Sequence, residues 1–130
     1  MTRITSVATH PRVLTVDDDS GFRTAVVQVV EATRGFESVG SVESGEDAIE
    51  MLDSLRPDLV LMDVVMPGLG GIEAARRIKE ARSSTVLVLV STTHPEDLPR
   101  EARECLADEI VWKAELRPAL LEEIWRRHGV

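Results

Sequence analysis

The sequence predicts an α/β fold, a five-stranded parallel sheet of order 2-1-3-4-5 flanked by five helices. Short apolar runs alternate along the 130 residues with segments whose apolar residues recur at helical spacing. Because this alternation produces right-handed crossovers, it favours a parallel sheet with helices on both faces. The runs at 58–62 and 85–90 are unbroken, as expected of strands that are covered on both sides. For five strands, 2-1-3-4-5 is a common doubly wound order.

Five short runs rich in valine, leucine and isoleucine are the expected strands. They lie at residues 12–16, 36–42, 58–62, 85–90 and 109–112. The run at 36–42 alternates apolar and polar residues, which is typical of an edge strand. The run at 85–90 is the most hydrophobic, which fits a strand buried on both faces.

The segments between these runs carry helix signals. Apolar residues at helical spacing predict helices over about 20–34, 44–55, 72–78, 96–106 and 116–128. In the first of them, Phe22 lies on the expected inward face. Ser44 opens the sequence SGED, which resembles a capping box. The fourth helix is the weakest, because Pro95 and Pro99 disfavour a helix interior. We therefore expect either a short helix that starts near Pro99 or an irregular segment over 93–99.

The composition limits the classes of function. A chain of 130 residues suits a single domain, here 1–130 with a core of about 12–128. Its net charge of −8 repels phosphate backbones and anionic lipids, so direct binding to nucleic acid or membranes is disfavoured. Cys105 is the only cysteine, which excludes an internal disulfide and favours a cytoplasmic location. No apolar run approaches the ~20 residues that cross a bilayer.

Polar residues suited to chemistry lie at the expected carboxyl ends of four strands. They are Asp17, Asp18 and Asp19 after the first strand, Asp63 after the third, Ser91 after the fourth and Lys113 after the fifth. In doubly wound sheets, ligands bind beyond these ends, where the strand order reverses. We therefore expect the carboxylates of the first and third strands to converge. Carboxylates with no histidine or cysteine beside them suit Mg²⁺.

Such a pocket fits the transfer of a phosphoryl group to an aspartate. Asp63 is the better candidate nucleophile, because it stands alone before an open turn. Asp17 and Asp18 are adjacent and suit metal binding. A metal ion would neutralise the phosphoryl oxygens, and Lys113 and Ser91 would take up the remaining charge.

These residues give the chain a resemblance to the receiver domain of bacterial response regulators. The matching segments are VDD (16–18), DLVLMDVVMPGLGG (58–71), Ser91 after LVLV and Lys113 after IVW. The match covers essentially 12–128, and every motif falls at an expected strand end. The resemblance implies a flavodoxin-like fold and two-component signalling. HPED and VVEATRGFESVG resemble the subfamily that usually carries a helix-turn-helix output.

The resemblance also implies a role for each residue. Asp63 would accept the phosphoryl group from a sensor histidine kinase or a phosphotransfer protein. The ligands of Mg²⁺ would be Asp18, Asp63 and the backbone carbonyl of Val65, with Asp17 acting through water. The phosphoryl oxygens would be bound by Ser91 and Lys113. Asp19 occupies a position that the family lets vary, and we expect it at a helix N-terminus.

The resemblance implies partners as well. The family usually docks its partners on the face formed by the fourth helix, fifth strand and fifth helix. We expect a downstream protein partner or a homodimer there, and no nucleic acid bound by this chain itself. Because the chain ends shortly after the fifth helix, we expect a stand-alone receiver, although a piece of a DNA-binding regulator would look the same. Such a receiver is no enzyme beyond its own phosphorylation and dephosphorylation.

Two positions depart from the family pattern. Three residues before Lys113 the family usually has an aromatic residue that reports phosphorylation, whereas this chain has Ile110 and no tyrosine. After the lysine, many members have a proline in a cis bond. Here that residue is Ala114, for which a cis bond is costly, so we expect a different loop.

Two other functions fit parts of the sequence. In a haloacid-dehalogenase-like phosphatase, Asp17 would be the nucleophile and Asp19 the acid and base. That hypothesis leaves Asp63 unexplained and lacks a late acidic pair. A pseudo-receiver, which binds partners without phosphorylation, is favoured slightly by Ile110. The complete set of strand-end residues argues against it.

Overall fold

A computed structural model describes residues 10–129 and contains one parallel sheet of order β2-β1-β3-β4-β5. Its strands are β1 (Arg12–Val16), β2 (Glu37–Val42), β3 (Leu59–Asp63), β4 (Val86–Ser91) and β5 (Glu109–Trp112). The predicted strand order is therefore confirmed, and the alternating strand, β2, lies at one edge. Strands β1 and β3 are neighbours, as the convergence of their carboxyl ends requires.

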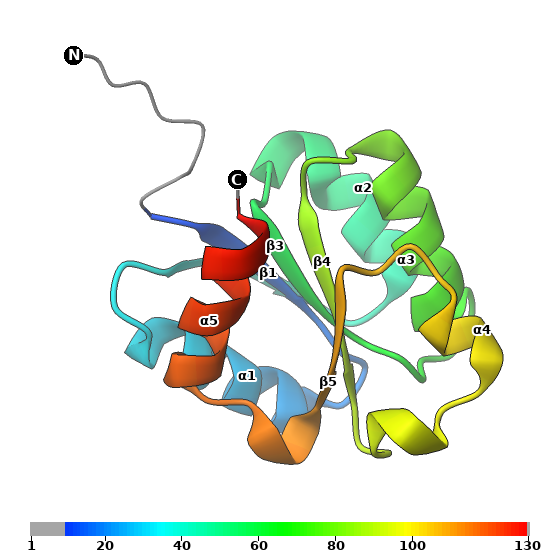
Figure 1. Ribbon diagram of the computed structural model, residues 1–130. Helices are drawn as coiled ribbons and strands as arrows, with labels where there is room; N and C mark the ends of the chain where they lie inside the picture. The colour runs from blue at the N-terminus through cyan, green and yellow to red at the C-terminus, as the bar shows by residue number, and fades with distance from the viewer. Residues whose placement is uncertain (1–9, 130) are drawn as a thin grey trace.

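Helices cover both faces of the sheet (Figure 1). Helices α1 (Ser20–Ala32) and α5 (Pro118–His128) pack on one face, and α2 (Gly45–Leu55), α3 (Gly70–Ala81) and the short α4 (Arg100–Arg103) pack on the other. Successive strand residues alternate between the two layers: Val13 packs with α1 and α5, and Leu14 packs with α2 and α3. Both faces of each central strand are thus buried, which explains the unbroken apolar runs.

Side-chain caps fix where the first two helices begin. The Asp19 carboxylate accepts a hydrogen bond from the backbone N–H of Phe22 at 3.0 Å. The Ser44 hydroxyl accepts one from the N–H of Asp47 at 3.0 Å. Each such cap stabilises its helix by about 1 kcal/mol. Asp19 is therefore the helix N-terminal residue that the sequence predicts.

The helix expected over 96–106 is much shorter than the spacing predicts. Pro95–Asp97 forms a 3₁₀ turn, and only Arg100–Arg103 is α-helical. The two prolines cause the interruption, because neither has an N–H to donate to a continuing helix. Ala102 nevertheless reaches the core beside α3. The short helix near Pro99 and the irregular segment before it thus occur together.

The loop after β5 forms a 3₁₀ turn over Lys113–Glu115. Every peptide bond that the structure describes, in residues 10–129, is trans. Within the same range, no helix has both the length and the hydropathy to cross a membrane.

Candidate functional site

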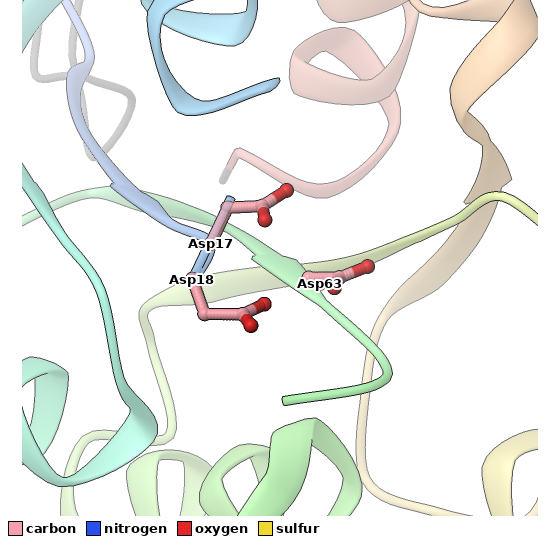
Figure 2. A group of neighbouring side chains, drawn as sticks. All are labelled: Asp17, Asp18 and Asp63. Atoms are coloured by element: carbon pink, nitrogen blue, oxygen red, sulfur yellow. The ribbon is translucent and has the colours of Figure 1, made fainter. Parts of the chain in front are cut away.

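Three aspartates converge at the carboxyl ends of β1 and β3. Asp17 and Asp18 directly follow β1, and Asp63 is the last residue of β3. Each offers a carboxylate oxygen within 4.8 Å of the oxygens of the other two. Figure 2 shows the three side chains on the same side of the strand ends. Mutual repulsion makes such a group unfavourable unless cations compensate it.

Asp17 is the buried member of the group. It is only 2% exposed, and both of its carboxylate oxygens accept hydrogen bonds. Oδ1 accepts from the N–H of Asp19 at 2.9 Å, and Oδ2 accepts from the Lys113 ammonium at 2.8 Å. Asp18 is exposed, and the Asp63 side chain is 11% exposed. Asp18 and Asp63 are therefore the carboxylates that a ligand can reach directly.

Lys113 is the cation of this group. Its Nζ atom lies 2.8 Å from Oδ2 of Asp17 and 3.4 Å from Oδ1 of Asp63. The one ammonium does not balance the three carboxylates, and the group keeps a formal charge of −2. Because the carboxylates supply only oxygen donors, this remaining charge fits a hard divalent cation such as Mg²⁺.

The environment of Asp63 makes its carboxylate unusually basic. Burial raises the pKa of Asp63 from its ordinary 3.8 to about 6, against the opposing effect of Lys113. The negative charges of Asp17 and Asp18 raise this pKa further. An ionised Asp63 is therefore under-compensated by the protein alone. Binding a cation or forming a bond to phosphorus would relieve that excess charge.

Ser91 ends β4, beside Asp63 in the sheet. The register pairs Asp63 with Val90, and pairs Ser91 with Trp112 on β5. The Ser91 hydroxyl is buried, and its oxygen accepts a hydrogen bond from the N–H of Thr93 at 2.9 Å. The hydroxyl proton is left for donation to another acceptor.

A family model described as the response regulator receiver domain matches residues 13–125. The chain belongs to this family. It is 36% identical over 88 residues to the response regulator GacA of Pseudomonas aeruginosa, covering 68% of this chain and 41% of that protein. It is 30% identical over 130 residues to the nitrate/nitrite response regulator NarL of Escherichia coli, and the match covers 83% of this chain and 60% of that protein. The chain thus spans about two fifths to three fifths of these relatives' length.

Solved structures agree with this receiver fold. The response regulator domain of Thermotoga maritima CheB is 29% identical with a TM-score of 0.78, over 92% of this chain and 97% of that one. A LuxR-family two-component response regulator from Aurantimonas sp. SI85-9A1 is 26% identical with a TM-score of 0.78, over 92% and 89%. The expectation of a two-component receiver is confirmed, and the phosphatase and pseudo-receiver alternatives are not favoured.

The turn after Asp63 holds the receiver's β3 against α3. The N–H of Gly71 donates to the carbonyl of Val64 at 3.1 Å. A Cβ atom at Gly71 would lie 2.1 Å from the carbonyl oxygen of Asp63, so only glycine fits there. Val65 lies in the turn between Asp63 and Gly71, and it is exposed. That its backbone carbonyl binds Mg²⁺ stays a prediction.

Two residues beside the site, Glu46 and Phe22, were not predicted from the sequence to lie there. Glu46 of α2 accepts a hydrogen bond from the N–H of Leu69 at 3.2 Å and so fixes the same turn. Phe22 was expected on the inward face of α1, and that expectation is wrong. The residue is 41% exposed, and the Lys113 ammonium lies over the face of its ring. The first turn of α1 lies beyond the strand ends, where the helical inward face meets the site instead of the core.

Proposed function

We propose that this receiver accepts a phosphoryl group on Asp63 from a sensor histidine kinase or a phosphotransfer protein. The observation that carries the proposal is the Lys113 ammonium between Asp17 and Asp63, at the edge of a carboxylate group that remains negative. An Asp63 oxygen would form the new bond to phosphorus. The bond between phosphorus and the donor's imidazole nitrogen would break, and that nitrogen would keep the electron pair.

The other residues divide the remaining tasks. Asp18, Asp63 and the carbonyl of Val65 would hold Mg²⁺, with Asp17 acting through water because hydrogen bonds already engage both of its oxygens. Bound Mg²⁺ would neutralise charge on the phosphoryl oxygens. Lys113, already 3.4 Å from Asp63, and the Ser91 hydroxyl would bind those oxygens from the other side.

A mass measurement tests this proposal. The protein is incubated with Mg²⁺ and acetyl phosphate, and its intact mass is followed with time. We expect a gain of one phosphoryl group that disappears in Asp63→Asn and after chelation of the metal ion. Asp53→Asn, which changes an exposed aspartate of α2, is the matched control and should keep the gain. A gain that persists in Asp63→Asn would refute Asp63 as the acceptor.

The same measurement separates the alternatives. A phosphatase with Asp17 as nucleophile would lose the adduct in Asp17→Asn and keep it in Asp63→Asn. The burial of Asp17 and its two hydrogen bonds argue against that nucleophile. A pseudo-receiver would show no adduct in any variant.

The signalling context follows from the same proposal. We assign the chain to a single cytoplasmic receiver domain over 1–130. Phosphorylation would change the affinity with which a protein partner, or a second copy of the chain, binds the face around α4, β5 and α5. Its enzymatic activity would be limited to its own phosphorylation and dephosphorylation. The net charge of −8 supports protein contacts in preference to direct contact with nucleic acid.

A further inference from the structure

Phe22 is a large apolar side chain left at the surface directly beside the site. The Nζ atom of Lys113 lies 3.9 Å from the centroid of its ring. The Lys113 side chain is only 9% exposed although it ends in a charge, and Phe22 is an exposed residue. The ring therefore covers the ammonium from the side that the carboxylates leave open, at a distance typical of a cation–π contact.

A closed path of contacts fixes the ring and the ammonium relative to each other. The N–H of Phe22 donates to Asp19 at 3.0 Å, and the N–H of Asp19 donates to Oδ1 of Asp17 at 2.9 Å. The second oxygen of Asp17 accepts from Lys113 at 2.8 Å. The same carboxylate thus positions both the start of α1, which carries the ring, and the cation beneath the ring.

The two carboxylate contacts of Lys113 are unequal. Its ammonium lies closer to Asp17, at 2.8 Å, than to Asp63, at 3.4 Å. Water on the open side would screen both contacts and let the long lysine side chain sample other positions. A ring face on that side excludes water and attracts the charge without neutralising it. The ring therefore adds no negative charge that would compete with an incoming anion for the Lys113 ammonium.

We propose that Phe22 is a positioning residue for phosphoryl transfer, and that the face of its ring holds the Lys113 ammonium where it meets the phosphoryl oxygens. This inference rests on the proposed function. Phe22 does not touch the reacting atoms and acts only through Lys113. In the step that it supports, an Asp63 oxygen bonds to phosphorus as the bond to acetate breaks, and acetate leaves with the electron pair.

The test compares rates of phosphoryl mass gain from acetyl phosphate at saturating Mg²⁺. Phe22→Leu keeps an apolar cover but loses the π face, and we expect its rate to fall about fivefold. Phe22→Trp restores a π face and should stay within about twofold of wild type. Phe36→Leu is the matched control, because Phe36 packs against the core beneath α1 and α5 and should leave the rate unchanged.

Two further readouts separate positioning from general structure. In a Lys113→Met background, adding Phe22→Leu should change the residual rate by less than about twofold, because the partner of the ring is gone. In the metal-free protein, the ε-methylene protons of Lys113 should show an upfield ring-current shift in NMR that Phe22→Leu abolishes and Phe36→Leu keeps.

The outcomes are distinguishable. If wild type gains no phosphoryl group, the proposed function fails. If wild type gains it and Phe22→Leu reacts at the same rate, this inference alone is wrong. It is equally wrong if Phe22→Leu slows the Lys113→Met background as much as it slows wild type, or if the ring-current shift is missing.

Discussion

Replacing Asp63 with asparagine should stabilise the metal-free protein at neutral pH. Burial raises the pKa of Asp63 to about 6, so the folded protein holds this carboxylate ionised at a cost. Asparagine has nearly the same size and no charge. Lys113 keeps its 2.8 Å contact with Asp17 in the variant, so the substitution leaves no unpaired cation behind.

The magnitude follows from the pKa values. A rise from 3.8 to about 6 corresponds to about 3 kcal/mol at about 1.36 kcal/mol per unit. Part of the Asp63 side chain reaches solvent, which screens the effect, so we expect a gain of about 2 kcal/mol. Between about pH 4 and pH 6 the folded state binds more protons than the unfolded state, so the Asp63 contribution falls as pH rises through that window. The gain from Asp63→Asn is therefore complete above about pH 6 and vanishes near pH 4.

Urea unfolding of wild type and Asp63→Asn, at about pH 7.5 and about pH 4, measures this gain in the free energy of unfolding. A chelator keeps both proteins free of metal ions. The difference between wild type and variant removes the pH dependence of the groups that do not interact with Asp63. Asp53→Asn, at a fully exposed position, should change the free energy of unfolding little at either pH. A stabilisation that is equal at the two pH values, or a destabilised variant at about pH 7.5, would refute the reasoning. Added Mg²⁺ should stabilise wild type and have less effect on Asp63→Asn.

Three shorter predictions concern the sheet and its loops. The buried hydroxyl of Thr15 has no hydrogen-bond partner among residues 10–129, so Thr15→Val should raise the free energy of unfolding by about 1 kcal/mol in urea titrations. Gly71→Ala should lower it by about 2 kcal/mol or more and impair phosphorylation, because the new Cβ meets the Asp63 carbonyl. The Trp112 indole donates to a carbonyl of the β4–α4 loop at 3.2 Å. In a Trp125→Phe background, Trp112 fluorescence should therefore change on phosphorylation, and a constant spectrum would argue that this loop stays still.

The sheet was predictable because its signals are local and agree with one another. Each apolar run becomes a strand, and alternation with helices fixes a parallel topology. Strand ends gather at one edge of a parallel sheet, so the meeting of Asp17, Asp18 and Asp63 followed from their places at the ends of β1 and β3. Helix α4 was harder to predict, because two prolines and a helical apolar pattern give opposite signals over the same residues.

Phe22 shows why part of the site was beyond sequence reasoning. Helical periodicity assigns a direction to a side chain but not the partner that it meets. The side chain of Val26 points into the core. Phe22 lies one helical turn earlier on the same face, and there its side chain passes the strand ends and contacts Lys113. The contact joins α1 to the loop after β5, which are far apart in the sequence. No local pattern encodes such a pair.

Unequal burial divides the work among chemically identical aspartates. Asp17 loses access to solvent and gains two hydrogen bonds, one to the start of α1 and one to Lys113. Those bonds compensate its charge and tie the start of α1 to Lys113, which fits the proposal that Asp17 organises the site and does not react. Asp63 has only part of one ammonium for compensation and carries the raised pKa. Burial is therefore the main reason that the pKa of Asp63 is raised, and the 3.4 Å contact with Lys113 offsets it only in part.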